Sequence, residues 1–171
     1  MATRTIREQG DAALLKKSRV VTDFNVRMHT LLDDMRETLL AANGVGLAAP
    51  QVGVLRRAVL VLDLDRDGEA EDQLIELLNP EIIETRGEQE GAEGCLSIPG
   101  VWGVVKRPNY VKVRAQDRYG NWFEAEGTGL TARAFCHELD HLDGHLFTDF
   151  AERILTEEEM EKMAGDAEEE E

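Results

Sequence analysis

The chain has 171 residues, 42% of them apolar, which suits one compact domain with a substantial core. Its formal net charge of −16 makes it a poor candidate for sequence-independent binding to nucleic acid or to an anionic membrane. No apolar run approaches the length of a membrane span, and the first twenty residues lack the apolar core of a signal peptide. We therefore expect a cytoplasmic protein that has no membrane association.

The first predicted element is a helix over residues 24–42, where apolar side chains recur at helical spacing. Thr22 or Asp23 is expected to cap its start, and Asn43-Gly44 is a natural end. A glycine-rich loop, NGVGLAAPQVG, follows at once. Its glycines allow a backbone to run close to a ligand.

Six short segments rich in β-branched and aliphatic residues come next, and Gly, Pro, Asn and Asp separate them. They are predicted as strands. Their ranges are 57–63, 74–78, 81–86, 103–106, 110–117 and 121–126. Tyr119-Gly120-Asn121 lies between the last two, which predicts a hairpin there.

A second helix is predicted to follow the strands and to carry the sequence HELDH. Thr128 or Thr131 is expected to cap its start, and it should run to about Leu142, where Gly144 ends it. A group of strands with helices before and after it is typical of an α+β domain. We expect mixed or antiparallel β-sheets around this central helix, with an N-terminal and a C-terminal helix.

The C-terminal helix is predicted near residues 157–164, because Thr156 and Glu159 can form a capping box at its start. The last fifteen residues hold nine acidic residues and one lysine, a composition typical of a solvated, partly disordered tail. No interdomain linker or repeat is recognised. The chain is therefore divided into a single domain over residues 1–155 and a helix with an acidic tail over residues 156–171.

The stretch AFCHELDHLDG fits the pattern H-E-x-x-H. Residues four apart on a helix lie on one face, so His137 and His141 can reach the same metal ion. Glu138 is the next residue round the helix and is well placed to act as a base. A catalytic metal usually has three protein ligands and one open position, so a third ligand is needed.

Cys95 is the best candidate for the third ligand. It lies in the short segment EGCLSIPG, and a reducing compartment would leave it as a free thiol. Cys136 is the rival, but it adjoins His137 and lies about 100° round the helix from it. We interpret Cys136 as a small buried apolar residue.

Three segments, GVGLAAPQ, EGCLS and HELDH, together resemble the peptide deformylase family. The resemblance extends from RTIREQGD to LFTDF, and so covers most of the chain. It implies an enzyme that hydrolyses the N-formyl group from the N-terminal formyl-methionine of newly made polypeptides and releases formate. The partners implied are N-formyl-methionyl peptides, with transient contact with the ribosome as a further expectation.

The resemblance also implies a role for each residue of the metal site. Cys95, His137 and His141 would bind one divalent metal ion, usually Fe²⁺ in the family, with Zn²⁺, Ni²⁺ or Co²⁺ as substitutes. Metal-bound water would be the nucleophile, and Glu138 would act as general base and then as general acid.

Other residues are implied to bind the substrate. The side chain of Gln51 and the backbone N–H of Leu96 would bind the oxygen of the reacting carbonyl. Trp102 stands where some members of the family have an arginine that touches the peptide, so preferences beyond methionine are not predicted. The residues expected to contact the peptide or to line the methionine pocket are Gly44, Val45, Gly46, Gly94, Arg133 and Ala134.

One further pairing is a hypothesis: Asp140 or Glu93 pairs with Arg107 and braces the site. Two other functions remain open on the residues alone. An endopeptidase would need another ligand downstream, and His145 lies only four residues past His141, beyond a helix-breaking glycine. A structural metal site in a binding module would need a fourth protein ligand.

Overall fold

The computed structural model describes residues 2–170, without the side chains of residues 164–170. Short 3₁₀ segments, η1 (Ala12–Leu15), η2 (Ala49–Val52) and η3 (Phe147–Asp149), connect the main elements. The helices are α1 (Val26–Ala42), α2 (Ala70–Gln73), α3 (Gly129–Leu142) and α4 (Glu157–Glu170). The strands are β1 (Gly46–Ala48), β2 (Ala58–Leu62), β3 (Leu74–Arg86), β4 (Gln89–Cys95), β5 (Ile98–Arg107), β6 (Tyr110–Gln116), β7 (Trp122–Thr128) and β8 (Arg153–Ile154).

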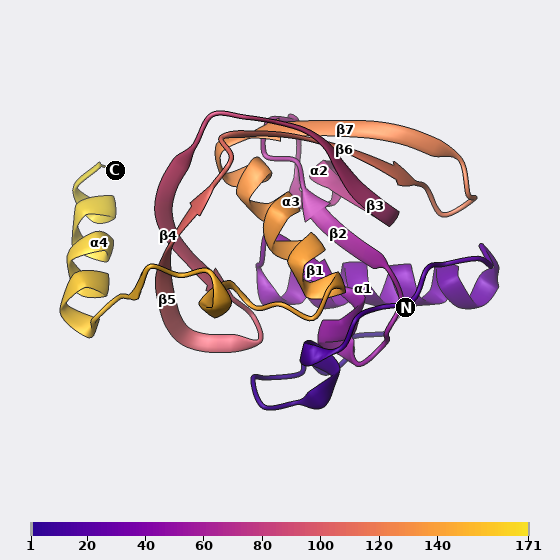
Figure 1. The fold of residues 1–171 in the computed structure, drawn as a ribbon, viewed down its shortest axis with the longest axis horizontal. Coiled ribbons are helices and arrows are strands. Elements are labelled where there is room, and N and C mark those ends of the chain that lie inside the picture. Colours follow the sequence, from indigo (N-terminus) through magenta and orange to yellow (C-terminus); the bar gives the residue numbers. More distant parts are fainter. Residues whose placement is uncertain (1, 171) are drawn as a thin grey trace.

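The strands form two antiparallel sheets. The larger has the order β1-β2-β3-β6-β7, and the smaller has the order β4-β5-β8. Figure 1 shows α3 running between the two sheets, with α4 beyond β5 and away from α3. This arrangement confirms the predicted α+β fold with antiparallel sheets around a central helix.

Strand β2 is buried along its whole length because both faces of the larger sheet are covered. Ala58, Leu60 and Leu62 pack into the apolar cluster that includes the buried face of α1. Val59 and Val61 point the other way and pack against α3. A fully apolar strand of this kind holds α1 and α3 on opposite sides of one sheet.

Most of the predicted helices and strands are confirmed, with two differences. Helix α1 is capped by Asn25, which accepts a hydrogen bond from the Met28 N–H at 3.2 Å, so the prediction of Thr22 or Asp23 was wrong. The two strands predicted over 74–86 are one strand, with a register shift between Leu78 and Glu81.

The ends of α3 and the start of α4 follow the sequence prediction closely. Thr128 occupies the N-cap position of α3, although its side chain makes no capping hydrogen bond, and Gly144 has a φ of 79° just after the helix. The Glu159 N–H donates to the Thr156 hydroxyl at 3.2 Å, and that hydroxyl is 3.2 Å from the Glu159 carboxylate. Helix α4 extends to Glu170, beyond the predicted end at 164. The predicted partial disorder of the acidic tail stays a prediction, because residue 171 and the side chains of residues 164–170 lie outside the described residues.

Within the part of the chain that the structure describes, no helix is both long and apolar enough to cross a membrane.

Candidate metal centre

Helix α3 carries three polar side chains on a face that is buried between the sheets. His137 and His141 are one turn apart, and their Nε2 atoms lie 3.2 Å from each other. Glu138 is only 3% exposed. Burial of three ionisable groups on one helix face is costly unless a partner or an ion compensates it.

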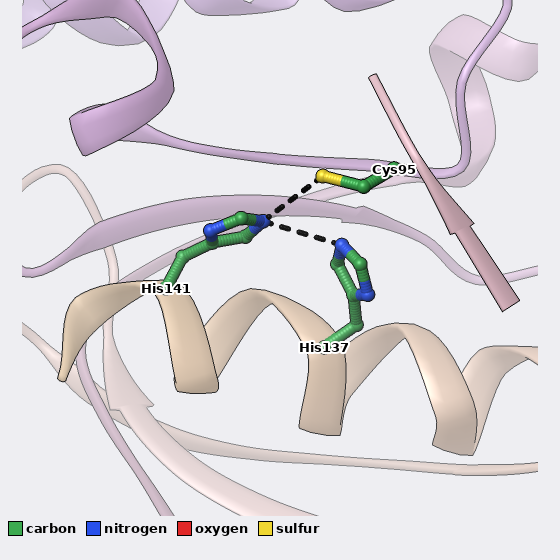
Figure 2. A group of neighbouring side chains, drawn as sticks. All are labelled: Cys95, His137 and His141. Atoms are coloured by element: carbon green, nitrogen blue, oxygen red, sulfur yellow. Dashed lines mark hydrogen bonds between the residues drawn. The ribbon is translucent and has the colours of Figure 1, made fainter. Parts of the chain in front are cut away.

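Cys95 brings a sulfur to the imidazole pair from another element. It is the last residue of β4, and the register between β4 and β5 shifts between Gly94 and Cys95. Its Sγ lies 3.4 Å from Nε2 of His141, and Figure 2 shows the sulfur pointing toward both rings from across the site. The three ligand atoms lie within 4.8 Å of one another, so the predicted residues are brought together.

The three atoms have a spacing that fits a metal ion. Metal–nitrogen bonds of about 2.05 Å and a metal–sulfur bond of about 2.3 Å, at tetrahedral angles, separate the ligand atoms by roughly 3.3 to 3.6 Å. The observed separations of 3.2 Å between nitrogens and 3.4 Å between nitrogen and sulfur agree with this. Among the described residues this cluster has three members, which is the set expected of a catalytic site rather than a closed structural one.

A carboxylate orients the first histidine. Nδ1 of His137 lies 2.8 Å from Oε2 of Glu93, which leaves Nε2 free to face the ligand cluster. Burial raises the pKa of Glu93, but hydrogen bonds from His137 and Arg107 outweigh it and lower the pKa to about 2. Burial and the neighbouring His137 hold the pKa of His141 well below its usual range, so His141 offers a lone pair.

Arg107 connects this carboxylate to the helix. Its guanidinium donates two hydrogen bonds to Glu93, at 3.1 and 2.7 Å, and one to Asp140 at 2.7 Å. The hypothesis that Asp140 or Glu93 pairs with Arg107 is confirmed, since both carboxylates do so. Burial raises the pKa of Asp140 more strongly than Arg107 lowers it.

Glu138 faces the glycine-rich loop. A Cβ at Gly46 would lie 2.5 Å from its Oε2 atom, so the carboxylate occupies space that only glycine leaves open. Burial raises the pKa of Glu138 to about 7. Its Oε1 atom has no hydrogen-bond partner among the described residues. A buried carboxyl group with this pKa exchanges protons near neutral pH.

Gln51 turns its amide toward the sulfur. Its Oε1 accepts a hydrogen bond from the Ala48 N–H at 2.9 Å, and its Nε2 lies 3.6 Å from Sγ of Cys95. The same Nε2 donates to the hydroxyl of Ser97 at 3.1 Å, and the Ser97 N–H approaches the sulfur at 3.4 Å. Leu96 lies beside them and packs partly against the α1 cluster.

A cavity of about 250 Å³ opens beside these residues. All six residues predicted to contact substrate line it: Gly44, Val45, Gly46, Gly94, Arg133 and Ala134. The guanidinium of Arg133 lies 3.0 Å from Glu93 and 3.1 Å from the Val105 carbonyl, so its charge is already paired within the protein.

Several residues of this site were not predicted from the sequence. Ser97 contacts both Gln51 and Cys95. A single serine in a short segment carries no pattern that would have predicted this role. The cavity is also lined by side chains whose positions no motif indicated, Ile98, Val101 and Leu130, and by Trp102, at the position where some members of the family have an arginine that touches the peptide. Cys136 is 6% exposed and packs with the apolar cluster of α3, as predicted. His145 lies 3.7 Å from Asp149 and is not a member of the ligand cluster.

The comparison with protein families decides the assignment. Residues 3–157 match the model described as polypeptide deformylase. The chain belongs to the polypeptide deformylase family. Membership confirms the expected activity, the removal of the N-formyl group from newly made polypeptides, and the class of enzyme, a hydrolase.

Relatives and solved structures agree with membership of the deformylase family. The peptide deformylase of Caldicellulosiruptor bescii is 56% identical over 162 residues, which are 95% of this chain and 93% of that protein. That of Acetivibrio thermocellus is 57% identical over 162 residues, covering 95% and 91%. The crystal structure of a peptide deformylase from Legionella pneumophila has a TM-score of 0.81 at 41% identity, covering 92% of this chain and 89% of that one.

Proposed function

We propose that Cys95, His137 and His141 hold the divalent metal ion of this deformylase. The observation that supports this most directly is the convergence of Sγ and two Nε2 atoms within 4.8 Å. When bound, such an ion supplies Lewis acidity, which lowers the pKa of water and polarises a carbonyl. The buried carboxylate of Glu93 fixes the proton of His137 on Nδ1, which keeps Nε2 available as a ligand.

Glu138 moves the proton in the proposed mechanism. Its pKa of about 7, raised by burial, suits a group that must first accept a proton and then release it. The carboxylate takes the proton from the attacking water. It later delivers that proton to the amine nitrogen, which leaves as formate is released. Gly46 provides the room in which this carboxylate stands.

The oxygen of the formyl group becomes negatively charged as water attacks it. Nε2 of Gln51 and the backbone N–H of Leu96 are proposed to donate hydrogen bonds to that oxygen. The amide of Gln51 is held by the Ala48 N–H, so this donor is oriented before the substrate binds. Loss of one such donor commonly raises the barrier by about 3 kcal/mol.

The cavity beside the ligand cluster is proposed to bind the methionine side chain. Val45, Leu130 and Ala134 supply apolar surface there, and Gly44 and Gly46 let the peptide backbone approach. Arg133 lines the same cavity, and its guanidinium is engaged by Glu93.

We assign Fe²⁺ as the ion in the cell, from the family resemblance. The His₂Cys set itself binds Zn²⁺ at least as tightly, and Ni²⁺ or Co²⁺ also fit, so availability decides. Metal analysis of protein prepared without oxygen tests this assignment, and zinc in such protein would contradict it. A cytoplasmic location is supported by two free thiols, which a reducing compartment preserves. Contact with the ribosome stays a prediction.

The test compares the two cysteines. Cys95→Ala should lose the bound metal and formate release from an N-formyl-Met-Ala peptide, because one of three ligands is gone. Cys136→Ala is the matched control, since it removes the other thiol from the same protein. It should keep one metal ion per chain and its activity. Retained metal in Cys95→Ala, or equal losses in both variants, would contradict the assignment.

A further inference from the structure

A second and larger cavity lies at the other end of α1, far along the helix from the metal centre. Its volume is about 670 Å³, and it shares no lining residue with the cavity at the metal ligands. The segment at 19–25, the first turns of α1 and the loop at 53–56 form its walls, and the N-terminal segment contributes Arg4. Pockets for small molecules commonly have volumes of roughly 300–1,000 Å³.

Two arginines stand side by side at this cavity. Arg19 and Arg56 are partners in a parallel β-bridge, with the Arg19 N–H donating to the Leu55 carbonyl at 3.0 Å. Both side chains are exposed and line the cavity. In the described part of the chain neither forms an ion pair, and Arg56 donates only to the carbonyl of its neighbour Leu55, at 3.2 Å. Like charges directly opposite each other destabilise a pairing of strands.

Arg27 adds a third positive charge in an unfavourable place. It is the second residue of α1, whose first turn contains no acidic residue. The N-terminus of a helix carries partial positive charge, so an anion is stabilised there and a cation is not. Arg27 also forms no ion pair within the described residues, although the chain has 35 carboxylate side chains.

The surrounding charges do not compensate these arginines. Among the described residues Asp23 is the one carboxylate in the cavity lining, and Arg4, the fourth arginine there, is already paired with Asp34 at 2.9 Å. Residues 1–57 contain nine basic and six acidic residues, a net charge of +3, whereas the whole chain has −16. The described lining of this cavity thus carries four arginines and one aspartate in an otherwise acidic protein.

We propose that this cavity binds an organic phosphate. Guanidinium groups match phosphate oxygens with paired hydrogen bonds, and a dianion placed between Arg19, Arg27 and Arg56 would relieve their mutual repulsion. The volume exceeds that of a phosphate group, and Val21, Leu31 and Val54 offer apolar walls for the body of the ligand. The ligand class is therefore a phosphorylated metabolite about the size of a mononucleotide.

Binding can be measured by isothermal titration of metal-loaded protein with three probes: AMP, inorganic pyrophosphate and succinate, each at constant ionic strength. AMP should bind more tightly than succinate. Arg56→Gln and Arg19→Gln should each weaken AMP binding by tenfold or more. Arg86→Gln is the matched control, because Arg86 is an exposed arginine on β3 outside the cavity, and this variant should bind AMP like the parent.

Three results would overturn the proposal. AMP that gives no measurable binding excludes the site, and succinate that binds as tightly as AMP excludes phosphate as its specific ligand. AMP binding that survives Arg19→Gln and Arg56→Gln unchanged shows that AMP binds elsewhere on the protein.

Thermal unfolding distinguishes a ligand site from a structural role for Arg56. Without phosphate and at low salt, Arg56→Gln should be at least as stable as the parent, because one of two adjacent positive charges is removed. With saturating AMP the order should reverse, since only the parent gains from the bound anion. An Arg56 with a purely structural role would make the variant less stable under both conditions, which would contradict the proposal.

Discussion

The two cavities differ in how the protein balances their charges. At the metal centre, Arg107 and Arg133 are buried and each pairs with Glu93, so the protein supplies its own counter-charge. At the end of α1, Arg19 and Arg56 are exposed neighbours with no carboxylate partner among the described residues. A buried charge needs a partner within the fold, whereas an exposed cluster of charges can be neutralised by a ligand.

The largest expected effect is a loss of activity without a loss of metal, caused by a change at Glu138. Glu138→Gln keeps the size of the side chain but removes the proton acceptor, so formate release should fall by about 10²–10⁴-fold. The metal content should stay at the parent level, because Glu138 is not one of the three clustered ligands. Formate assays and metal analysis of the same sample check both statements. Activity within tenfold of the parent would contradict the role of this carboxyl group.

A second effect, on stability, is expected when the ion pairs of Arg107 are removed. Arg107→Met leaves the buried Glu93 and the partly buried Asp140 without their common cation, which should cost about 3–5 kcal/mol of unfolding free energy. Urea unfolding measures this loss. Arg153→Met is the control, because Arg153 is exposed and its one ion pair among the described residues is with Glu159, so it should change stability little. Equal losses in the two variants would mean that burial of the pair is unimportant.

Gly46→Ala tests the close approach of the loop to the helix. The new Cβ would meet the Glu138 carboxylate at 2.5 Å, so the carboxylate must move and kcat should fall several-fold. Gly91→Ala is the matched control, since its Cβ would find its nearest neighbour at 3.4 Å, the terminal nitrogen of Arg133. Unchanged kcat in Gly46→Ala would show that Glu138 has room to adjust.

The smallest effect concerns an ion pair on α1. A hydrogen bond from the Ala2 N–H, together with Arg4, holds the pKa of Asp34 below its usual range despite partial burial. A carboxyl group whose pKa is lower in the folded state stabilises the protein at pH values above its pKa in the unfolded state, which is near 3.9. This stabilisation disappears as the pH falls through the pKa of the folded state. Asp34→Asn should therefore lower the urea midpoint at pH 7 and have less effect at pH 3. Asp67→Asn, a change at an exposed aspartate, is the control.

The sequence predicted the metal helix well because its information is local. Two histidines four apart must share a face, and Gly144 marks the end of the helix wherever the rest of the chain lies. The position of Cys95 is different, since a sulfur 42 residues earlier in the chain is brought to His137 only by the fold. Residue chemistry made it a candidate, and family resemblance selected it.

Strand β4 shows why part of the fold could not be predicted. Its sequence, QEGAEGC, contains no β-branched or aromatic residue, so propensity gave no signal. It is a strand because it pairs with β5 along nearly its whole length, and tertiary pairing overrides local preference. Likewise, Asn79 has a φ of 50° and lies at the register shift of β3, where the sequence suggested a break between two strands.

The ligand cluster draws its sulfur from the small sheet and its nitrogens from the helix that packs on the large one. Binding of an ion at this cluster and packing of the small sheet against α3 are consequently linked equilibria. A change that weakens one weakens the other. With an ion held by these three residues as proposed, a chelator would destabilise the packing of the two layers as well as inhibit the enzyme.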